Sequence, residues 1–451
     1  MKQRERRTHG GLLRWIDGPA FVPLCLLAAA LIRLAWVALV DARPIDDFSW
    51  YFGRAVGLSQ GLGLVFEGRL TALWPVGYPA TLGLLFLVTG PSLMAAKLLN
   101  VAFGLGILWL SYRIAQTLFQ SERTARLTLL GLSLYPNHVA YTSLTATELP
   151  FLFALLLGSW LLLRGRAVFR LPSAGVVFGW GCLIKPIMLF VPALMLLAAG
   201  SGGRGRKVAR DLLVVYAVLF CVVLPWTLRN YRVFDAFVLV SNNEGINLLI
   251  GNNAKATGGY VRELEEAPQI EAVDGELERD RLARALAIDY IRTHPWVTIA
   301  RVPAKLWHMY AKDVEGLHWN ELAMDAGEGT PRERPLFVLK LASQAIYLAL
   351  VGCFLLGCAR LALVGRPPGF DPRWSLGLWC IAYLSALCVV FFGSSRFHFP
   401  LIPWMMMYGV AGLVCADWGR RRVKLRRAVA GPHQAQGHLA RPVAADSPNP
   451  G

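Results

Sequence analysis

Two adjacent carboxylates, Asp46 and Asp47, lie shortly after a long apolar segment near the amino terminus, in a chain that places few acids near its apolar segments. Residues 48–52 are mostly aromatic, and Arg54 adds a positive charge. This pattern predicts a helix in a membrane interface, where an acid is costly unless it is used. A carboxylate there is well placed to act as a general base. A solvated turn after Pro44 is the alternative interpretation.

The composition indicates an all-α polytopic membrane protein. The chain has 451 residues, of which 55% are hydrophobic and 17% are charged, and its apolar residues form long runs. Such runs are typical of transmembrane helices. The net charge of +17 comes from Arg and Lys clustered in short segments between these runs. That is the positive-inside pattern of membrane proteins, and it argues against a nucleic-acid-binding surface.

Ten apolar segments are candidate spans. They are 19–40, 92–113, 125–142, 148–164, 171–185, 186–200, 209–227, 336–357, 374–393 and 397–416. The stretch 74–90 is short and carries two prolines, so we expect it to lie in the interface or to dip into the membrane without crossing it. With 171–200 divided at Lys185-Pro186, the arginine-rich connectors fall on one side of the membrane. This predicts ten spans with both termini cytoplasmic, in a bacterial inner (plasma) membrane.

This topology divides the chain into five parts. They are a basic cytoplasmic amino terminus (1–18), a transmembrane catalytic module (19–227) with a first external loop (41–91), an external or periplasmic domain (228–335), carboxy-terminal transmembrane helices (336–416) and a cytoplasmic, basic and disordered tail (417–451). The external domain is expected to be small and ordered, because it is rich in charged residues and has helical patterning near Leu277–Thr293. Interfacial helices are expected in the first external loop.

Several short motifs occur in an order that resembles one enzyme superfamily. They are Asp46–Tyr51, a Gly-rich stretch that leads to Trp74–Pro79, Ser143–Phe151, Leu183–Pro186, Gly251–Tyr260 and Ser395–Pro400. Together they resemble the GT-C glycosyltransferases, such as the protein O-mannosyltransferases and the aminoarabinose transferases of lipid A. The resemblance extends over about residues 20 to 415. One departure is that aspartate, at Asp47, stands where many relatives carry glutamate.

The resemblance implies a transfer reaction on the external membrane face. A sugar would move from a polyprenyl-phosphate carrier to an acceptor hydroxyl, with inversion at the anomeric carbon. Asp46 matches the catalytic position of the family and would deprotonate the acceptor, with Asp47 as the second catalytic candidate. The aromatic and acidic motif residues Tyr51, Tyr78 and Glu148, together with His398, are the candidates for binding substrate.

A departing phosphate needs cations, because its negative charge grows in the transition state and the interface has a lower dielectric constant than water. Lys185, beside a proline break, and Arg396, whose planar fork suits a phosphate, are the candidate ligands. The alternatives are that Lys185 pairs with Glu148 and that Arg396 reaches ordinary lipid phosphates. Glu148 could instead orient a sugar hydroxyl, hold Lys185 or favour a helix amino terminus.

No metal-ligand spacing connects the histidines, so a zinc site is not expected, although two adjacent carboxylates could bind a divalent cation. The resemblance implies that no cofactor is needed. The expected partners are the polyprenyl-phosphate sugar, a glycan, lipid or protein acceptor, and membrane lipids. Two other functions stay open: a flippase or transporter of lipid-linked glycans, and a polysaccharide polymerase or ligase that uses a similar external face.

Overall fold

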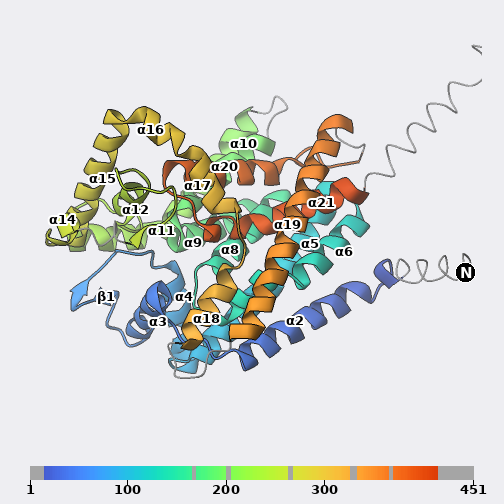
Figure 1. Ribbon diagram of the computed structural model, residues 1–451, viewed down its shortest axis with the longest axis horizontal. Helices are drawn as coiled ribbons and strands as arrows, with labels where there is room; N and C mark the ends of the chain where they lie inside the picture. Colours follow the sequence, from blue (N-terminus) through green and yellow to red (C-terminus); the bar gives the residue numbers. More distant parts are fainter. Residues whose placement is uncertain are drawn as a thin grey trace, which may run out of the picture.

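The protein is built almost entirely from helices (Figure 1). A computed structural model describes residues 15–164, 169–199, 205–262, 268–325, 333–364 and 369–414. Within these ranges, regular β structure is limited to one antiparallel hairpin, formed by β1 (Val65–Phe66) and β2 (Arg69–Leu70). The all-α fold class expected from the sequence is confirmed. The tail 417–451 and most of the basic amino terminus lie outside the described residues, so their predicted states stay predictions.

The described helices fall into two halves in chain order. The first half contains α2 (Phe21–Leu39), α3 (Asp46–Ser59), α4 (Gly77–Thr89), α5 (Leu93–Phe119), α6 (Glu122–Ser133), α7 (Pro136–Ala140), η1 (Tyr141–Ser143), α8 (Glu148–Leu163), α9 (Arg170–Ile184), η2 (Pro186–Phe190) and α10 (Val191–Ala199). The second half contains α11 (Gly205–Phe234), α12 (Glu244–Gly251), α14 (Pro268–Glu271), α15 (Glu276–Thr293), α16 (Pro295–Ala300), α17 (Val302–Tyr310), α18 (Glu315–Asp325), α19 (Glu333–Val364), α20 (Leu376–Val390), η3 (Ser395–Phe397), η4 (Phe399–Leu401) and α21 (Ile402–Val414).

Local sequence chemistry sets several helix boundaries that matter for the site. The Ser92 hydroxyl caps α5 by accepting a hydrogen bond from the Ala95 N–H at 3.2 Å. Helix α9 ends at Ile184 because Pro186 disfavours helical backbone at the preceding residue, and Lys185 is accordingly extended. The 171–200 stretch is therefore divided at Lys185, as the charge pattern predicted.

Five helices in the described ranges are long and apolar enough to cross a membrane, and a sixth candidate is a bent pair. The bent pair joins 136–143 to Glu148–Leu163 at an angle of 118°, with a short break between them. Four shorter apolar helices complete the set. Each of the ten predicted segments coincides with one or more helices, but how many of them cross the membrane stays a prediction. The stretch 74–90 forms the short helix α4.

The segment 228–335 contains helices that pack partly on one another and partly on the apolar bundle. Helices α12, α14 and α15 share a small core that includes Leu249, Ile270 and Ala283. Helix α17 instead contacts α20, and α18 contacts α7 and α19. In Figure 1, α12, α14 and α15 gather at one side, while α18 lies against the long helices. The patterning near Leu277–Thr293 corresponds to α15 (Glu276–Thr293).

A buried lysine joins α17 to the end of α20. The Lys305 ammonium donates to Asn252 Oδ1 at 3.0 Å and to the carbonyl oxygens of Val389 at 3.0 Å and Val390 at 3.4 Å. Burial lowers the pKa of Lys305 to about 8. Because Asn252 belongs to the predicted Gly251–Tyr260 motif, this motif is bonded directly to the segment that leads into η3.

Gly251 tests this connection. A Cβ atom at Gly251 would lie 1.8 Å from the carbonyl oxygen of Phe391, which is backbone and cannot move freely. We expect Gly251→Ala to lower the free energy of unfolding by about 1 to 3 kcal/mol, because the added methyl overpacks this contact. Gly352→Ala is the control, since nothing lies within 4 Å of its Cβ. Thermal unfolding of the full chain in nanodiscs measures both, and equal melting temperatures would contradict the assignment.

Candidate active site

The two adjacent acids lie at the start of α3 and have different partners. Asp46 is the first residue of the helix and has a positive φ of 45°, which is uncommon outside glycine. Its side chain is 43% exposed, and its Oδ1 lies 3.6 Å from a guanidinium nitrogen of Arg262. The side chain of Asp47 instead accepts a hydrogen bond from Arg396 at 2.9 Å. Asp46 thus keeps an exposed carboxylate beside the exposed Arg262, while Asp47 is held by Arg396.

Arg396 brings three distant segments together. Its Nη2 contacts Asp47 Oδ2 at 2.9 Å, and its Nε donates to Glu148 Oε1 at 2.9 Å. The same Glu148 oxygen accepts a hydrogen bond from Lys185 Nζ at 3.1 Å. Four residues that the sequence singled out separately therefore form one ion-pair network, which joins the amino ends of α3 and α8, the α9–η2 break and the η3 turn. We call Asp47, Glu148, Lys185 and Arg396 the ion-pair network.

The ion-pair network balances two positive against two negative charges. The Glu148 side chain is fully buried, whereas the side chain of Lys185 is 24% exposed and that of Arg396 is 19% exposed. The arginine also lies 5.3 Å from the centre of the Phe48 ring, which adds a cation–π contact. The expected alternative in which Lys185 pairs with Glu148 is the arrangement found. Both cations remain partly accessible to an anion.

Tyr51 and Tyr78 belong to a buried aromatic cluster behind α3. The Tyr51 ring lies 5.9 Å from the ring of Trp74 and 6.1 Å from that of Tyr78, centre to centre. The Tyr78 hydroxyl donates to Asn100 Oδ1 at 3.2 Å. Burial, reinforced by the charge of Asp47, raises the pKa of Tyr51 well above its ordinary value. Tyr51 therefore stays a neutral hydrogen-bond donor beside the ion-pair network.

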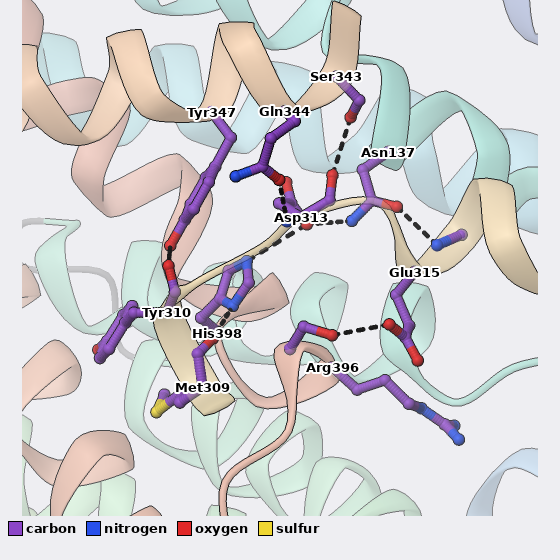
Figure 2. A network of polar contacts seen from close by, with 12 residues as sticks. Asn137, Met309, Tyr310, Asp313, Glu315, Ser343, Gln344, Tyr347, Arg396 and His398 are labelled. Carbon is purple, nitrogen blue, oxygen red and sulfur yellow. Dashed lines mark hydrogen bonds and ion pairs between the residues drawn. The ribbon is translucent and has the colours of Figure 1, made fainter. Parts of the chain in front are cut away.

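His398 lies in a second polar network, two residues beyond Arg396 (Figure 2). Its Nδ1 is bonded to the carbonyl oxygen of Met309, and its Nε2 lies 3.2 Å from Asp313 Oδ1. The rings of Tyr310 and Tyr347 stack on it with centres 5.9 and 5.0 Å away. The histidine is fully buried, and both ring nitrogens face protein groups. The structure thus does not bring His398 into the ion-pair network with the other predicted residues.

The sequence interpretation missed the residues that hold this second network. The buried Asp313 carboxylate accepts hydrogen bonds from the Tyr135 hydroxyl and the Asn137 amide. The backbone N–H of Asp313 donates to Gln344 Oε1 at 3.0 Å. Glu315 Oε2 accepts a hydrogen bond from Ser395 at 2.7 Å. In the sequence both acids lie in an acid-rich loop, and no local pattern distinguishes them. Only their contacts in the folded chain identify them as part of this network.

Metal binding receives no support from side-chain geometry in the part of the chain that is described. There, no group of three or more His, Cys, Asp and Glu side chains could hold a metal ion. Whether the reaction needs a divalent cation at Asp46 and Asp47 stays a prediction, as does the expectation that no cofactor is required.

Glu148→Gln tests whether the shared carboxylate holds both cations. The substitution keeps the size of the side chain but removes the counter-ion of Lys185 and one of the two acids that bind Arg396. We expect the free energy of unfolding to fall by about 2 kcal/mol, less than for a fully buried pair because both cations are partly exposed. Thermal unfolding in nanodiscs measures the loss. The exposed Glu278→Gln is the control, and equal losses in both variants would argue against the network.

Comparison with known proteins gives one sequence match and several structural ones. Residues 74–228 match the family model of the dolichyl-phosphate-mannose-protein mannosyltransferases. No curated protein is significantly similar to the chain in sequence. The stretch that matches the family model includes Tyr78, Glu148 and Lys185. Asp46, Asp47 and Arg396 lie outside that stretch.

Among solved structures, the oligosaccharyltransferase of Archaeoglobus fulgidus in complex with zinc and sulfate superposes with a TM-score of 0.51 at 16% identity. The alignment covers 90% of this chain and 51% of the oligosaccharyltransferase, so the chain spans about half the length of that enzyme. The same enzyme tethered to an acceptor peptide gives a TM-score of 0.52 at 14% identity, covering 95% of this chain and 53% of the enzyme.

ArnT from Cupriavidus metallidurans, bound to undecaprenyl phosphate, is more distant, with a TM-score of 0.42 at 13% identity, covering 88% of this chain and 77% of ArnT. The resemblance suggested by the order of the motifs is supported both by the family match within the first half of the chain and by the superposition over most of it. The chain has the GT-C glycosyltransferase fold.

Proposed function

We propose that the protein is a glycosyltransferase that moves a sugar from a polyprenyl-phosphate carrier to an acceptor hydroxyl on the external membrane face. The observation that carries the proposal is the ion-pair network beside Asp46. It holds two partly exposed cations and includes Asp47, the chain neighbour of the exposed Asp46. Departure of a phosphate requires cations, and deprotonation of a hydroxyl requires a carboxylate. The GT-C fold and the family match, whose name specifies a dolichyl-phosphate-linked mannose, support the same class of donor.

In the proposed reaction, Asp46 accepts the proton of the acceptor hydroxyl as its oxygen attacks the anomeric carbon. The new bond joins the acceptor oxygen to that carbon, and the bond between the carbon and the phosphate oxygen breaks. The electron pair of the broken bond leaves with the polyprenyl phosphate, and attack from the opposite face inverts the configuration. Asp46 suits this role because its carboxylate is exposed and is not bonded to Arg396.

Lys185 and Arg396 are proposed to bind the phosphate by exchanging partners. Both cations are neutralised by carboxylates in the structure, so a phosphate must share them or displace a carboxylate. Their partial exposure allows an anion to approach, and the guanidinium can present two N–H groups to one phosphate. Displacing Asp47 from Arg396 would release a second carboxylate next to Asp46 at the moment when the donor binds.

The membrane location follows from the same proposal. The helices long enough to cross a membrane and the basic connectors between apolar segments support a bacterial inner (plasma) membrane protein with both termini cytoplasmic. The ion-pair network would then face the external side, where the carrier presents its sugar. Glycan, lipid and protein acceptors are all compatible with the exposed position of Asp46.

Asp46→Asn keeps the shape of the side chain and removes the base. We expect transfer to fall by about 100-fold or more, because general-base catalysis contributes that much, while binding of the bare carrier is retained. Transfer is measured with purified protein, a panel of radiolabelled polyprenyl-phosphate sugars and envelope extract. Asp41→Asn, an exposed carboxylate in the same loop, is the control. Full activity of Asp46→Asn would refute the base assignment, and carrier binding without transfer in the wild type would favour a flippase.

Lys185→Ala and Arg396→Ala test the phosphate contacts. Each removes a cation that would touch the phosphate both in the bound donor and in the transition state, so we expect donor affinity and turnover to fall together. The loss of one charge-assisted hydrogen bond corresponds to roughly a tenfold to hundredfold weaker donor affinity. Binding of undecaprenyl phosphate in nanodiscs measures the first effect. Lys255→Ala, an exposed lysine of the external segment, is the control, and unchanged carrier affinity in both variants would exclude the phosphate roles.

A further inference from the structure

The first turn of α18 is fixed against the segment that leads into Glu148. The Gly316 N–H donates to Asn137 Oδ1 at 2.7 Å, and the Asn320 amide donates to the carbonyl oxygen of Ala140 at 2.9 Å. A Cβ atom at Gly316 would lie 2.8 Å from Cδ2 of Tyr141. A glycine is thus needed for this close approach. The residue before it, Glu315, is consequently held beside η1.

The same segment is fixed to the turn that carries Arg396. Asp313 faces His398 at 3.2 Å, while the Ser343 hydroxyl donates to the Asp313 carbonyl oxygen at 2.9 Å. Figure 2 shows these contacts together, with Asp313 between α19 and the histidine. Since Asp313 is fully buried and bonded on several sides, the loop from it to Glu315 has little freedom. The position of Glu315 relative to Arg396 is therefore set by the fold.

The Glu315 carboxylate is used only in part by the protein. Its Oε2 accepts from the Ser395 hydroxyl at 2.7 Å, and within the described ranges neither Oε1 nor the carboxylate as a whole has a cationic partner. In Figure 2 this carboxylate and the Arg396 guanidinium point to the same side of the network. Glu315 is half-buried, so part of its carboxylate stays accessible to a ligand.

Two further polar atoms in this region have no hydrogen-bond partner in the described part of the chain. They are the hydroxyl of Tyr141, whose side chain is fully buried, and the second carboxylate oxygen of Glu148. The Tyr141 ring packs against the start of α18, where a Cβ atom at Gly316 would lie 2.8 Å from its Cδ2. Buried polar groups are normally bonded, so unpartnered ones beside an accessible acid indicate a missing polar partner. The Tyr141 hydroxyl can donate a hydrogen bond, and the second oxygens of Glu148 and Glu315 can each accept one.

We propose that Glu315 and Tyr141 form a subsite for the hydroxyl groups of the donor sugar, next to the cations that would hold its phosphate. A sugar hydroxyl both donates and accepts hydrogen bonds, so it can pair with a carboxylate and with a tyrosine hydroxyl together. The sugar is linked directly to the phosphate, so a phosphate bound at Arg396 would bring the sugar close to Glu315, which is bonded to Ser395. This subsite rests on the proposed function and adds to it two residues that would recognise the sugar hydroxyl groups.

The competing explanation is that Glu315 merely favours the amino terminus of α18 through the helix dipole. Glu244 offers a matched control, because it is likewise the first residue of a helix, α12, and is exposed. A residue that acts only on its own helix would leave ligand affinity unchanged when its charge is removed. We therefore expect Glu244→Gln to leave the affinity for both lipids unchanged.

The experiment measures binding of two kinds of lipid to the full chain in nanodiscs. One probe is undecaprenyl phosphate, and the other is undecaprenyl phosphate that carries one of a panel of hexoses and pentoses. Glu315→Gln keeps the shape and can still accept the Ser395 hydrogen bond. We expect it to bind the preferred sugar-bearing lipid about 10- to 100-fold more weakly, while affinity for the bare lipid stays within about twofold. Tyr141→Phe should give a loss of about 3- to 10-fold in the same direction.

Each other outcome overturns the subsite in a distinct way. Equal losses for both lipids would mean that Glu315 acts on the phosphate or on folding, and an unchanged affinity for the sugar-bearing lipid would mean that it does not touch the sugar. In these cases the proposed function survives. A wild type that binds neither lipid would refute the proposed function together with the subsite.

Discussion

The structure depends on how Arg396 is compensated. Removing a guanidinium from water costs several kcal/mol unless its N–H groups meet charged acceptors. Asp47 and Glu148 supply these acceptors, and Glu148 also binds Lys185. Because this one arginine binds both acids, helix α3, the start of α8 and the η3 turn meet at one place. The prolines and short helices around them allow this meeting, since long straight helices could not turn there.

The segment 228–335 holds the Arg396 turn from its other side. Lys305 binds the carbonyl oxygens at the end of α20, and the Gly393 N–H donates to the Gly258 carbonyl oxygen at 2.8 Å. Asp313 faces His398, two residues after Arg396. The segment 228–335 thus supports the site through these contacts, and its predicted place outside the membrane stays a prediction. Its buried polar contacts are directional, which suits a part that must place a charged group accurately.

The sequence predicted the helices and offered the Lys185–Glu148 pair as one alternative, but it did not predict the partners of Arg396. Apolar runs located the helices, Pro186 located the α9 break, and the order of the motifs singled out Glu148, Lys185 and Arg396. Pairing could not be read in the same way, because Arg396 meets an acid 349 positions away in the chain. His398 was expected to bind substrate through its position in a motif, yet its surroundings are set by Asp313 and two stacked tyrosines. The number of membrane crossings depends on short and bent helices, whose length does not determine whether they span.

A neutral ion-pair network also restricts what can bind. An uncharged ligand cannot replace a carboxylate on Arg396 without leaving a cation uncompensated, whereas a phosphate supplies equivalent oxygen acceptors and charge. The carboxylate that a phosphate displaces does not leave the site, because Asp47 is fixed in α3 next to Asp46. Added negative charge beside Asp46 would disfavour its ionised form and so strengthen it as a base. Binding of the anion and the basicity of Asp46 would then be coupled through Arg396, because the acid that Arg396 releases lies next to Asp46 in α3.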